Sequence, residues 1–187
     1  MRLFAAIPIP EPALGELASV LERLRSMDWP VRWVRPEGLH LTLKFFGQVP
    51  GDETDLLENA LARAAEGHGP VPVACTGLGS FPPGRRARVI WMGLDAPAGL
   101  ELLQDSVERS CESAGYAVEG RPFRPHVTLG RVLEGKNLPI NALEHVSPIN
   151  EIAFLAEKIV LFESRPASGG PSYIPLRSIG LTSCQAV

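Results

Sequence analysis

Cysteine is scarce in this sequence: only Cys75, Cys111 and Cys184 occur among its 187 residues, and no two of them form a CxxC pair. A sparse, odd-numbered set argues against a disulfide framework and against a zinc knuckle, and it favours a reducing compartment, the cytoplasm. Long hydrophobic runs are absent too, because no apolar stretch approaches the ~20 residues needed to cross a bilayer. Prolines at positions 8 and 10 interrupt the apolar N-terminal stretch, which indicates a first strand rather than a signal peptide. We therefore expect no membrane association.

An excess of positive charge is also missing, because 18 Lys and Arg residues are outweighed by 21 Asp and Glu residues. A formal net charge of −3 excludes a broadly basic protein that coats nucleic acid, and leaves room only for a local basic site. Neither the P-loop nor the Rossmann glycine fingerprint occurs. The 45% of hydrophobic and 21% of charged residues are typical of a folded globular protein. The length predicts one domain over residues 1–187, or one domain built from two similar halves.

Helical and strand-like segments alternate along the chain. Apolar residues recur on one face of a helix over 11–27, 52–66 and 97–114, with a shorter candidate at 138–145. Strand-like runs rich in β-branched, aromatic and leucine residues lie between them, at 32–34, 39–46, 71–76, 88–94, 116–120, 126–132, 152–154, 158–164 and 172–181. This order predicts an α+β fold with helices packed on largely antiparallel sheets.

Two short strand-like segments share one pattern. Residues 40–43 read His-Leu-Thr-Leu and residues 126–129 read His-Val-Thr-Leu, about half a chain length apart. Because side chains alternate between the two faces of a strand, the histidine and threonine of each motif share one face and the apolar residues share the other. A duplicated unit with a groove between its halves would present two imidazoles and two hydroxyls to one ligand.

That set of groups suits phosphoester chemistry. Near neutrality one imidazole can be neutral and accept a proton from water, while the other is charged and gives a proton to the leaving oxygen. The hydroxyls of Thr42 and Thr128 can donate hydrogen bonds to phosphoryl oxygens. Two alternatives stay open: His40 and His126 as hydrogen-bonded structural residues, or as zinc ligands. The zinc alternative is weaker because catalytic zinc usually has three protein ligands and no HExxH motif occurs.

The motifs also carry a resemblance to a known family. Residues 31–47 and 123–131 resemble the two signature segments of the RNA 2′,3′-cyclic phosphodiesterases, also called 2′-5′ RNA ligases, in the two-histidine phosphoesterase superfamily. The similarity extends to residues 2–7, 159–164 and 170–173, and so covers nearly the whole chain.

The resemblance implies a bilobal duplicated α+β fold with pseudo-two-fold symmetry and an active-site groove between the lobes. It implies hydrolysis of a ribose 2′,3′-cyclic phosphate to a 2′-phosphomonoester without metal or cofactor, and in some members weak reversible 2′-5′ joining of RNA ends. Carried over by motif position, His40 is the proton donor to the 3′ oxygen and His126 the proton acceptor that activates water. Thr42 and Thr128 hold the phosphoryl oxygens.

Charged residues that flank the motifs are candidates for binding the substrate phosphate. Lys44 is four residues after His40, which on a regular strand gives it the same face. Arg124 and Arg131 flank the second motif. Arg131 is five residues after His126 and would point to the opposite face, unless a bulge at Gly130 turned it back.

Aromatic residues near the motifs are candidates for base stacking. By the same alternation, Phe46 shares the face of His40, whereas we expect Phe45 and Trp91 to lie in the core. The arginines of residues 85–88 form a loop that either meets an RNA backbone or is simply solvated.

The leading hypothesis is thus a monomeric enzyme acting on RNA ends or nucleotides that carry a cyclic phosphate. One alternative is a phosphodiesterase for small cyclic phosphates, such as ADP-ribose 1″,2″-cyclic phosphate or a nucleoside 2′,3′-cyclic phosphate. Another is a module that binds RNA or nucleotides without catalysis. Intact histidine–threonine pairs argue against that last alternative.

Overall fold

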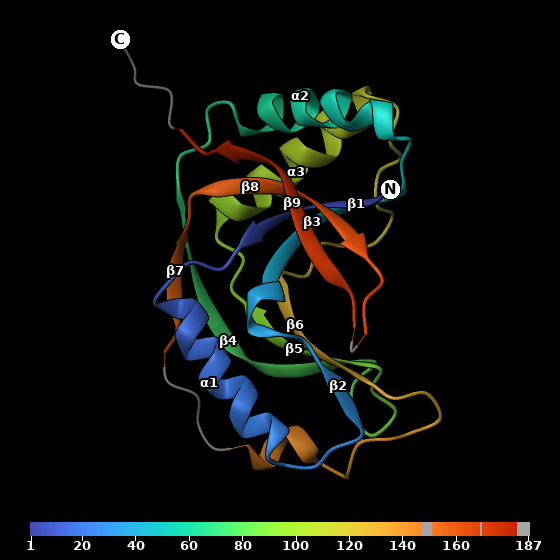
Figure 1. The fold of residues 1–187 in the computed structure, drawn as a ribbon. Coiled ribbons are helices and arrows are strands. Elements are labelled where there is room, and N and C mark those ends of the chain that lie inside the picture. The colour runs from blue at the N-terminus through green and yellow to red at the C-terminus, as the bar shows by residue number, and fades with distance from the viewer. Residues whose placement is uncertain (147–150, 169, 183–187) are drawn as a thin grey trace.

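The computed structural model describes residues 1–146, 151–168 and 170–182. Antiparallel strands form one strongly twisted sheet in the order β7-β4-β5-β6-β3-β1-β8-β9, and β2 also pairs with β6 (Figure 1). The strand bounds are β1 Arg2–Pro8, β2 Val31–Trp33, β3 His40–Gln48, β4 Val71–Phe81, β5 Val89–Leu94, β6 His126–Val132, β7 Ala153–Ala156, β8 Lys158–Arg165 and β9 Ser172–Gly180.

The sheet divides into two halves of similar construction. One half runs β7-β4-β5-β6 and the other runs β9-β8-β1-β3, so β6 and β3 meet at the middle. There Leu41 of β3 pairs with Val127 of β6, the central residues of the two histidine motifs. Both side chains are fully buried on the face that carries the core. The expected duplication around a central seam is therefore present.

In the described part of the chain, three α-helices cover the sheet: α1 Ala13–Arg25, α2 Thr54–Ala65 and α3 Ala98–Ser113. Each is amphipathic and buries the apolar stripe that its sequence predicts, such as Leu17, Leu21 and Leu24 on α1. Helices α2 and α3 lie together over the β1–β8–β9 side, whereas α1 lies beside β4 in the other half (Figure 1). Side chains from all three helices belong to one continuous buried cluster.

Helices α1 and α3 therefore join the halves. Helix α1 follows β1 in sequence but lies along the opposite half, where the charge of its Glu16 acts on Cys75 of β4. Burial, together with the charges of Asp95 and Glu16, raises the pKa of the Cys75 thiol to about 11. Helix α3 follows β5 but places Glu108 against Lys44 of β3.

The two central strands contain matching bulges. In the β1–β3 pair, Ala6 is opposite Thr42 but Ala5 is opposite Lys44, so Leu43 is an extra residue. In the β5–β6 pair, Trp91 is opposite Thr128 but Ile90 is opposite Gly130, which makes Leu129 extra. An extra residue reverses the alternation of faces beyond it. The bulge expected at Gly130 is thus found, and its counterpart at Leu43 has no adjacent glycine to predict it.

Most of the expected elements are found with small shifts at their ends. The candidate helix at 138–145 is a short 3₁₀ turn, η3 Ala142–His145; two further turns are η1 Pro36–Gly38 and η2 Gly51–Glu53. The expectation of a strand at 116–120 is wrong, because this segment pairs with no neighbouring strand. The Tyr116 amide donates to the Cys111 carbonyl, the Ala117 carbonyl accepts from the Lys44 side chain, and the Glu119 amide donates to the Glu108 side chain. Within the described residues, no helix is long and apolar enough to span a membrane. Cys184 lies outside the described residues.

Candidate active site

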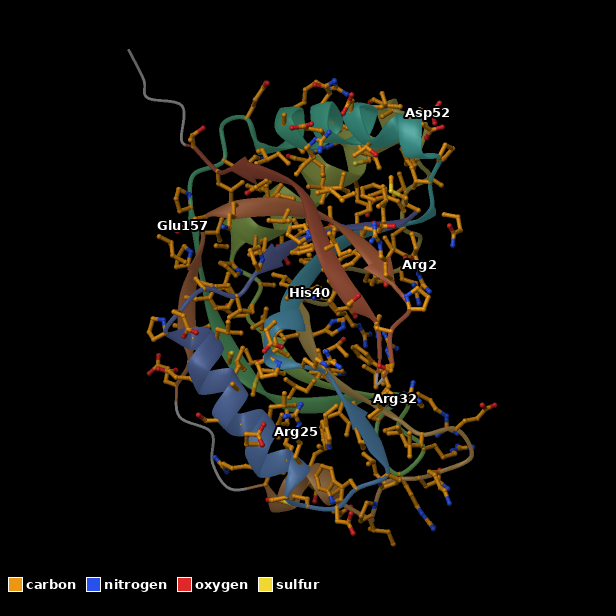
Figure 2. The ribbon with its side chains drawn as sticks, viewed as in Figure 1. Arg2, Arg25, Arg32, His40, Asp52 and Glu157 are labelled. Carbon is orange, nitrogen blue, oxygen red and sulfur yellow. The ribbon has the colours of Figure 1, made fainter. Side chains whose placement is uncertain are left out.

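The two histidine–threonine motifs meet at the seam of the sheet. With Leu41 and Val127 directed into the core, the histidine and threonine of each motif lie on the opposite face and are half-buried. Because β3 and β6 are antiparallel, the register places His40 beside Thr128 of the neighbouring strand and His126 beside Thr42. Figure 2 shows His40 near the middle of the molecule. The juxtaposition expected from the repeated pattern is therefore present.

Both imidazoles are held by the same kind of hydrogen bond. The Nδ1 atom of His40 lies 2.8 Å from the Gly38 carbonyl oxygen, and that of His126 lies 2.7 Å from the Arg124 carbonyl oxygen. Because a carbonyl only accepts, Nδ1 carries the proton in each ring. In the neutral form Nε2 is then the free acceptor, and in the charged form it is the donor. Either ring can accept or donate a proton at Nε2.

The surroundings of both rings favour the neutral form. Burial lowers the pKa of His40 to about 4, and the charge of His126 acts in the same direction, while the bond to Gly38 opposes it. Burial and the charge of Arg131 lower the pKa of His126. These effects place the two rings, and the Arg131 guanidinium, within electrostatic reach of one another.

Aromatic rings surround His40. Its ring centroid lies 4.9 Å from that of Phe4 and 5.0 Å from that of Tyr173, which meets it edge-on, and Phe162 lies 6.2 Å away. These contacts bury the imidazole and fix its orientation. The three rings come from β1, β8 and β9, which are far from His40 in sequence.

Aromatic rings also contact His126. Phe81 at the end of β4 meets the imidazole edge-on at 5.3 Å, and Trp91 of β5 lies at 6.2 Å. The expectation that Trp91 belongs to the core is wrong, because it lies opposite Thr128 on the face of the histidines. Sequence reasoning missed Phe4, Phe81 and Tyr173, although Phe4 and Tyr173 fall in the segments that carried the resemblance.

Arg131 lies on the site face. The bulge at Leu129 and Gly130 returns its side chain to the face of His126, and its charge acts on both His126 and Tyr173. Gly130 is required here, since a Cβ atom would lie 2.6 Å from Val31 Cγ1 on the neighbouring strand. The position fits a phosphate contact, whereas Arg124 contributes its carbonyl oxygen to His126 and exposes its side chain.

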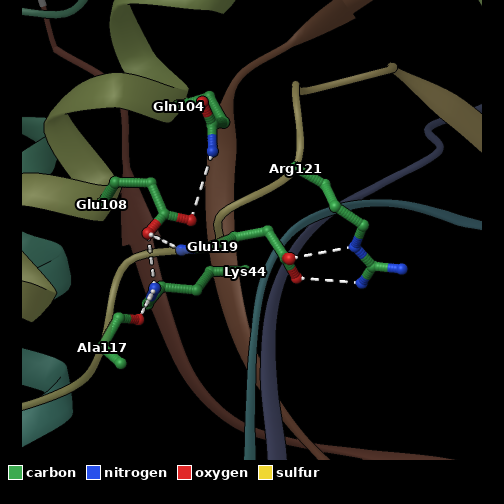
Figure 3. Close-up of polar contacts among 6 residues, drawn as sticks. All are labelled: Lys44, Gln104, Glu108, Ala117, Glu119 and Arg121. Carbon is green, nitrogen blue, oxygen red and sulfur yellow. Dashed lines mark hydrogen bonds and ion pairs between the residues drawn. The ribbon is translucent and has the colours of Figure 1, made fainter.

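Lys44 does not share the face of His40, and this expectation is wrong. The bulge at Leu43 directs it into the core, where only 4% of its surface is exposed. Its ammonium lies 2.5 Å from the Glu108 carboxylate of α3 and donates to the Ala117 carbonyl at 2.7 Å (Figure 3). Glu108 also accepts from the Glu119 amide and from Gln104. Lys44 is thus a structural ion-pair partner beneath the site.

The bulge also exchanges the expected positions of two phenylalanines. Phe46 lies on the helix side, with its ring 5.3 Å from that of Tyr116. Phe45 lies on the side of His40, where it contacts Phe4 and is 61% exposed. The expectation that Phe46 faces the site and Phe45 the core is therefore wrong.

The arginines of the 85–88 loop lie outside the immediate site. Arg88 donates to the carbonyl oxygens of Ala87 and Lys136. Arg85 lines a separate pocket of about 440 Å³ together with Trp29 and Leu138. Within the described residues, no group of three or more His, Cys, Asp or Glu side chains could hold a metal ion. The face that carries the two motifs brings together the imidazoles of His40 and His126, the hydroxyls of Thr42 and Thr128, and the guanidinium of Arg131.

Two histidines on one face of the seam between duplicated half-sheets, each with a threonine two residues further along its strand, form the arrangement expected of a two-histidine phosphoesterase. A family model described as the 2′-5′ RNA ligase superfamily matches residues 10–166, and the chain belongs to this superfamily.

Individual relatives agree with this assignment. The chain is 34% identical to the RNA 2′,3′-cyclic phosphodiesterase of Methanothermobacter thermautotrophicus over 73% of this chain and 74% of that protein. It is 31% identical to the RNA 2′,3′-cyclic phosphodiesterase of Aeropyrum pernix over 91% of this chain and 97% of that protein. Among solved structures, E. coli LigT complexed with 3′-AMP matches with a TM-score of 0.76 and 27% identity, over 97% of this chain and 98% of that one.

Proposed function

We propose that the protein hydrolyses RNA 2′,3′-cyclic phosphate ends to 2′-phosphomonoesters by acid–base catalysis between His40 and His126. The observation that carries the proposal is the pairing of Leu41 with Val127, which brings both histidine–threonine pairs to one face of the sheet. Each histidine has its Nδ1 occupied by a backbone carbonyl and Nε2 left for chemistry.

The reaction requires one proton acceptor and one proton donor. Neutral His126 takes a proton from water at Nε2, and the oxygen of that water attacks phosphorus. The bond from phosphorus to the ribose 3′ oxygen breaks, and charged His40 gives its Nε2 proton to that oxygen. Thr42 and Thr128 donate hydrogen bonds to the non-bridging oxygens, where negative charge develops. One water is consumed and the phosphate stays on the 2′ oxygen.

Arg131 adds positive charge where the phosphate would lie. Its guanidinium acts electrostatically on both His126 and Tyr173, so it borders the same space as the two imidazoles. Arginine suits this position because its fork of N–H donors matches two phosphate oxygens.

The relatives support the same reaction. Those compared above are named RNA 2′,3′-cyclic phosphodiesterases, and E. coli LigT binds a nucleotide monophosphate, 3′-AMP. When the 5′-hydroxyl of a second RNA replaces the attacking water, the same groups would form a 2′-5′ linkage, and the reverse of that step would cleave it.

The decisive experiment is hydrolysis of a short RNA ending in a 2′,3′-cyclic phosphate, with EDTA present and the product isomer identified. We expect a 2′-phosphate product and no effect of EDTA. His40→Ala and His126→Ala should each lower turnover about 10²–10⁴-fold, since each removes one proton-transfer partner. Circular dichroism of both variants controls for folding.

Other outcomes would point elsewhere. Activity that EDTA abolishes and zinc restores would identify a metallohydrolase. Binding of the RNA without turnover would indicate a binding module, and turnover confined to ADP-ribose 1″,2″-cyclic phosphate would indicate a small-molecule phosphodiesterase. Wild-type turnover in either histidine variant would contradict the assigned chemistry.

We also propose that the protein acts as a monomer in the cytoplasm. Cys75 and Cys111 are free thiols, which suits a reducing compartment. Gel filtration with light scattering would test the monomer.

A further inference from the structure

The matching bulges place Phe45 on the histidine face of β3. His40 and Thr42 in β3 correspond to His126 and Thr128 in β6, and each bulge follows directly after the threonine. The residue that returns to the histidine face beyond the bulge is Arg131 in β6. Its counterpart in β3, at the same distance from the histidine, is Phe45. One end of the site therefore presents a guanidinium and the other presents an aromatic ring.

Phe45 is both exposed and connected to the site. A single exposed apolar residue needs no explanation by itself. This ring, however, lies 5.9 Å from the ring of Phe4, which in turn lies 4.9 Å from His40. With 61% of its surface exposed, Phe45 ends the row of aromatic rings that starts at His40 and leaves a face open to a ligand.

Positive charge lies beside this row. Arg2 is on the same face of β1 as Phe4, two residues along the strand, and it is exposed. The charges of Arg131 and Arg2 both act on the Tyr173 hydroxyl, whose pKa is raised mainly by burial. Two guanidinium groups thus lie on the histidine face: Arg131, whose charge acts on His126, and Arg2, two residues along β1 from Phe4, the partner of Phe45.

We propose that Phe45 and Arg2 form a subsite for the nucleotide that precedes the one carrying the cyclic phosphate. The base of that nucleotide stacks on Phe45, and Arg2 binds the phosphodiester that joins the two nucleotides. An aromatic platform next to a cation is the usual means of binding single-stranded nucleic acid without reading its sequence. The inference rests on the proposed function and names its substrate class: RNA ends rather than mononucleotides.

The test compares two substrates in each variant. We measure kcat/KM for a nucleoside 2′,3′-cyclic phosphate and for a dinucleotide ending in the same cyclic phosphate. The ratio of the dinucleotide value to the mononucleotide value reports how much the added nucleotide contributes to kcat/KM. In Phe45→Ala this ratio should fall about five- to 150-fold, the range expected for loss of one base-stacking contact. Phe45→Tyr keeps a ring and should restore the ratio.

Leu102→Ala is the matched control, since Leu102 is similarly exposed at 57% but lies on α3, which packs against the other face of the sheet. This variant should leave the ratio unchanged. A ratio that stays within twofold of wild type in Phe45→Ala overturns the inference, and so does an equal loss on both substrates.

Salt dependence tests Arg2 separately. Arg2→Gln should lower the ratio and reduce the slope of log kcat/KM against log salt for the dinucleotide, because one phosphate contact is lost. Arg63→Gln on α2 removes the same charge from the helix side and should leave the slope unchanged. Equal slopes in wild type and Arg2→Gln overturn the role of Arg2.

The two proposals fail differently. If wild-type protein hydrolyses neither substrate, the proposed function fails. If it hydrolyses both and Phe45→Ala leaves the ratio unchanged, only the proposed subsite is contradicted.

Discussion

The two imidazoles lie in surroundings that keep both rings neutral at pH 7, whereas the proposed reaction needs one of them charged. Burial lowers the pKa of His40 to about 4 and also lowers that of His126. The anionic phosphate would raise both pKa values, because an opposite charge favours the protonated ring. Binding of the anionic substrate is therefore coupled to uptake of a proton from solvent, which converts the donor ring to its charged form.

This proton requirement predicts the pH dependence of the rate. The profile of kcat/KM reports the free enzyme, so its bell should have its maximum below pH 6.5 and fall as the pH rises through neutrality, when the required proton is lost. It should also fall at low pH, where both rings become charged. The profile of kcat reports the complex and should lie at higher pH. Initial rates from pH 4 to 9 provide the check, and an optimum of kcat/KM above pH 7 would contradict it.

At the scale of single elements, the buried ion pair of Lys44 and Glu108 makes the network under the site sensitive to mutation. Lys44 of β3 and Glu108 of α3 are both almost completely buried, and they bind the 116–120 segment that leads towards His126. Removing one member leaves an unpaired buried charge, which typically costs about 3–5 kcal/mol, whereas replacing both with apolar residues is often neutral or stabilising.

Lys44→Met should accordingly lower the free energy of unfolding by about 3–5 kcal/mol, and Lys44→Met with Glu108→Leu should regain most of that loss. Urea unfolding measures both. Arg109→Met, on the same helix, breaks the exposed pair with Asp105 and should cost no more than about 0.5 kcal/mol. The double variant should also keep its turnover, and a large loss of turnover would mean that Lys44 contacts the substrate after all.

In β3 and β6, the sequence predicts the faces of residues correctly only as far as the bulges. Strict alternation predicted the shared face of His40 and Thr42, and of His126 and Thr128, because each motif lies before its bulge. Beyond the bulge the same alternation assigned Lys44, Phe45 and Phe46 to the wrong faces.

Glycine at position 130 signalled one bulge, but Leu43 looks like any other strand residue. The aromatic partners of His40 depend on pairing between β1, β8 and β9, a long-range arrangement that no local pattern encodes.

At the scale of the whole molecule, helices α1 and α3 connect the two halves of the sheet. Helix α1 lies in the half that contains β4 although it follows β1, and α3 contacts β3 although it follows β5. We propose that residues 1–187 fold as one domain, because each half is covered in part by a helix that follows a strand of the other half.

This coupling predicts a single unfolding transition. The three tryptophans, Trp29, Trp33 and Trp91, all lie in or beside the half that contains β5 and β6, whereas Leu61 is buried on α2 over the other half. Leu61→Ala should lower the stability by about 2–5 kcal/mol and shift the tryptophan fluorescence and far-UV circular dichroism midpoints together. Leu56→Ala, exposed on the same helix, should shift neither. A fluorescence midpoint unmoved by Leu61→Ala would show independent lobes.

The near-equivalence of the two histidines bears on the direction of the reaction. Each ring is held by the carbonyl two residues before it, and each leaves the same atom, Nε2, for the substrate. For the proposed chemistry, the residue that donates in one direction accepts in the other, so the protein accelerates opening and closing of the phosphodiester alike. The concentrations of the reactants, rather than the protein, then set the direction of the reaction. Abundant water favours opening of the cyclic phosphate. A second RNA end held beside the proton acceptor would favour joining, with the same four side chains.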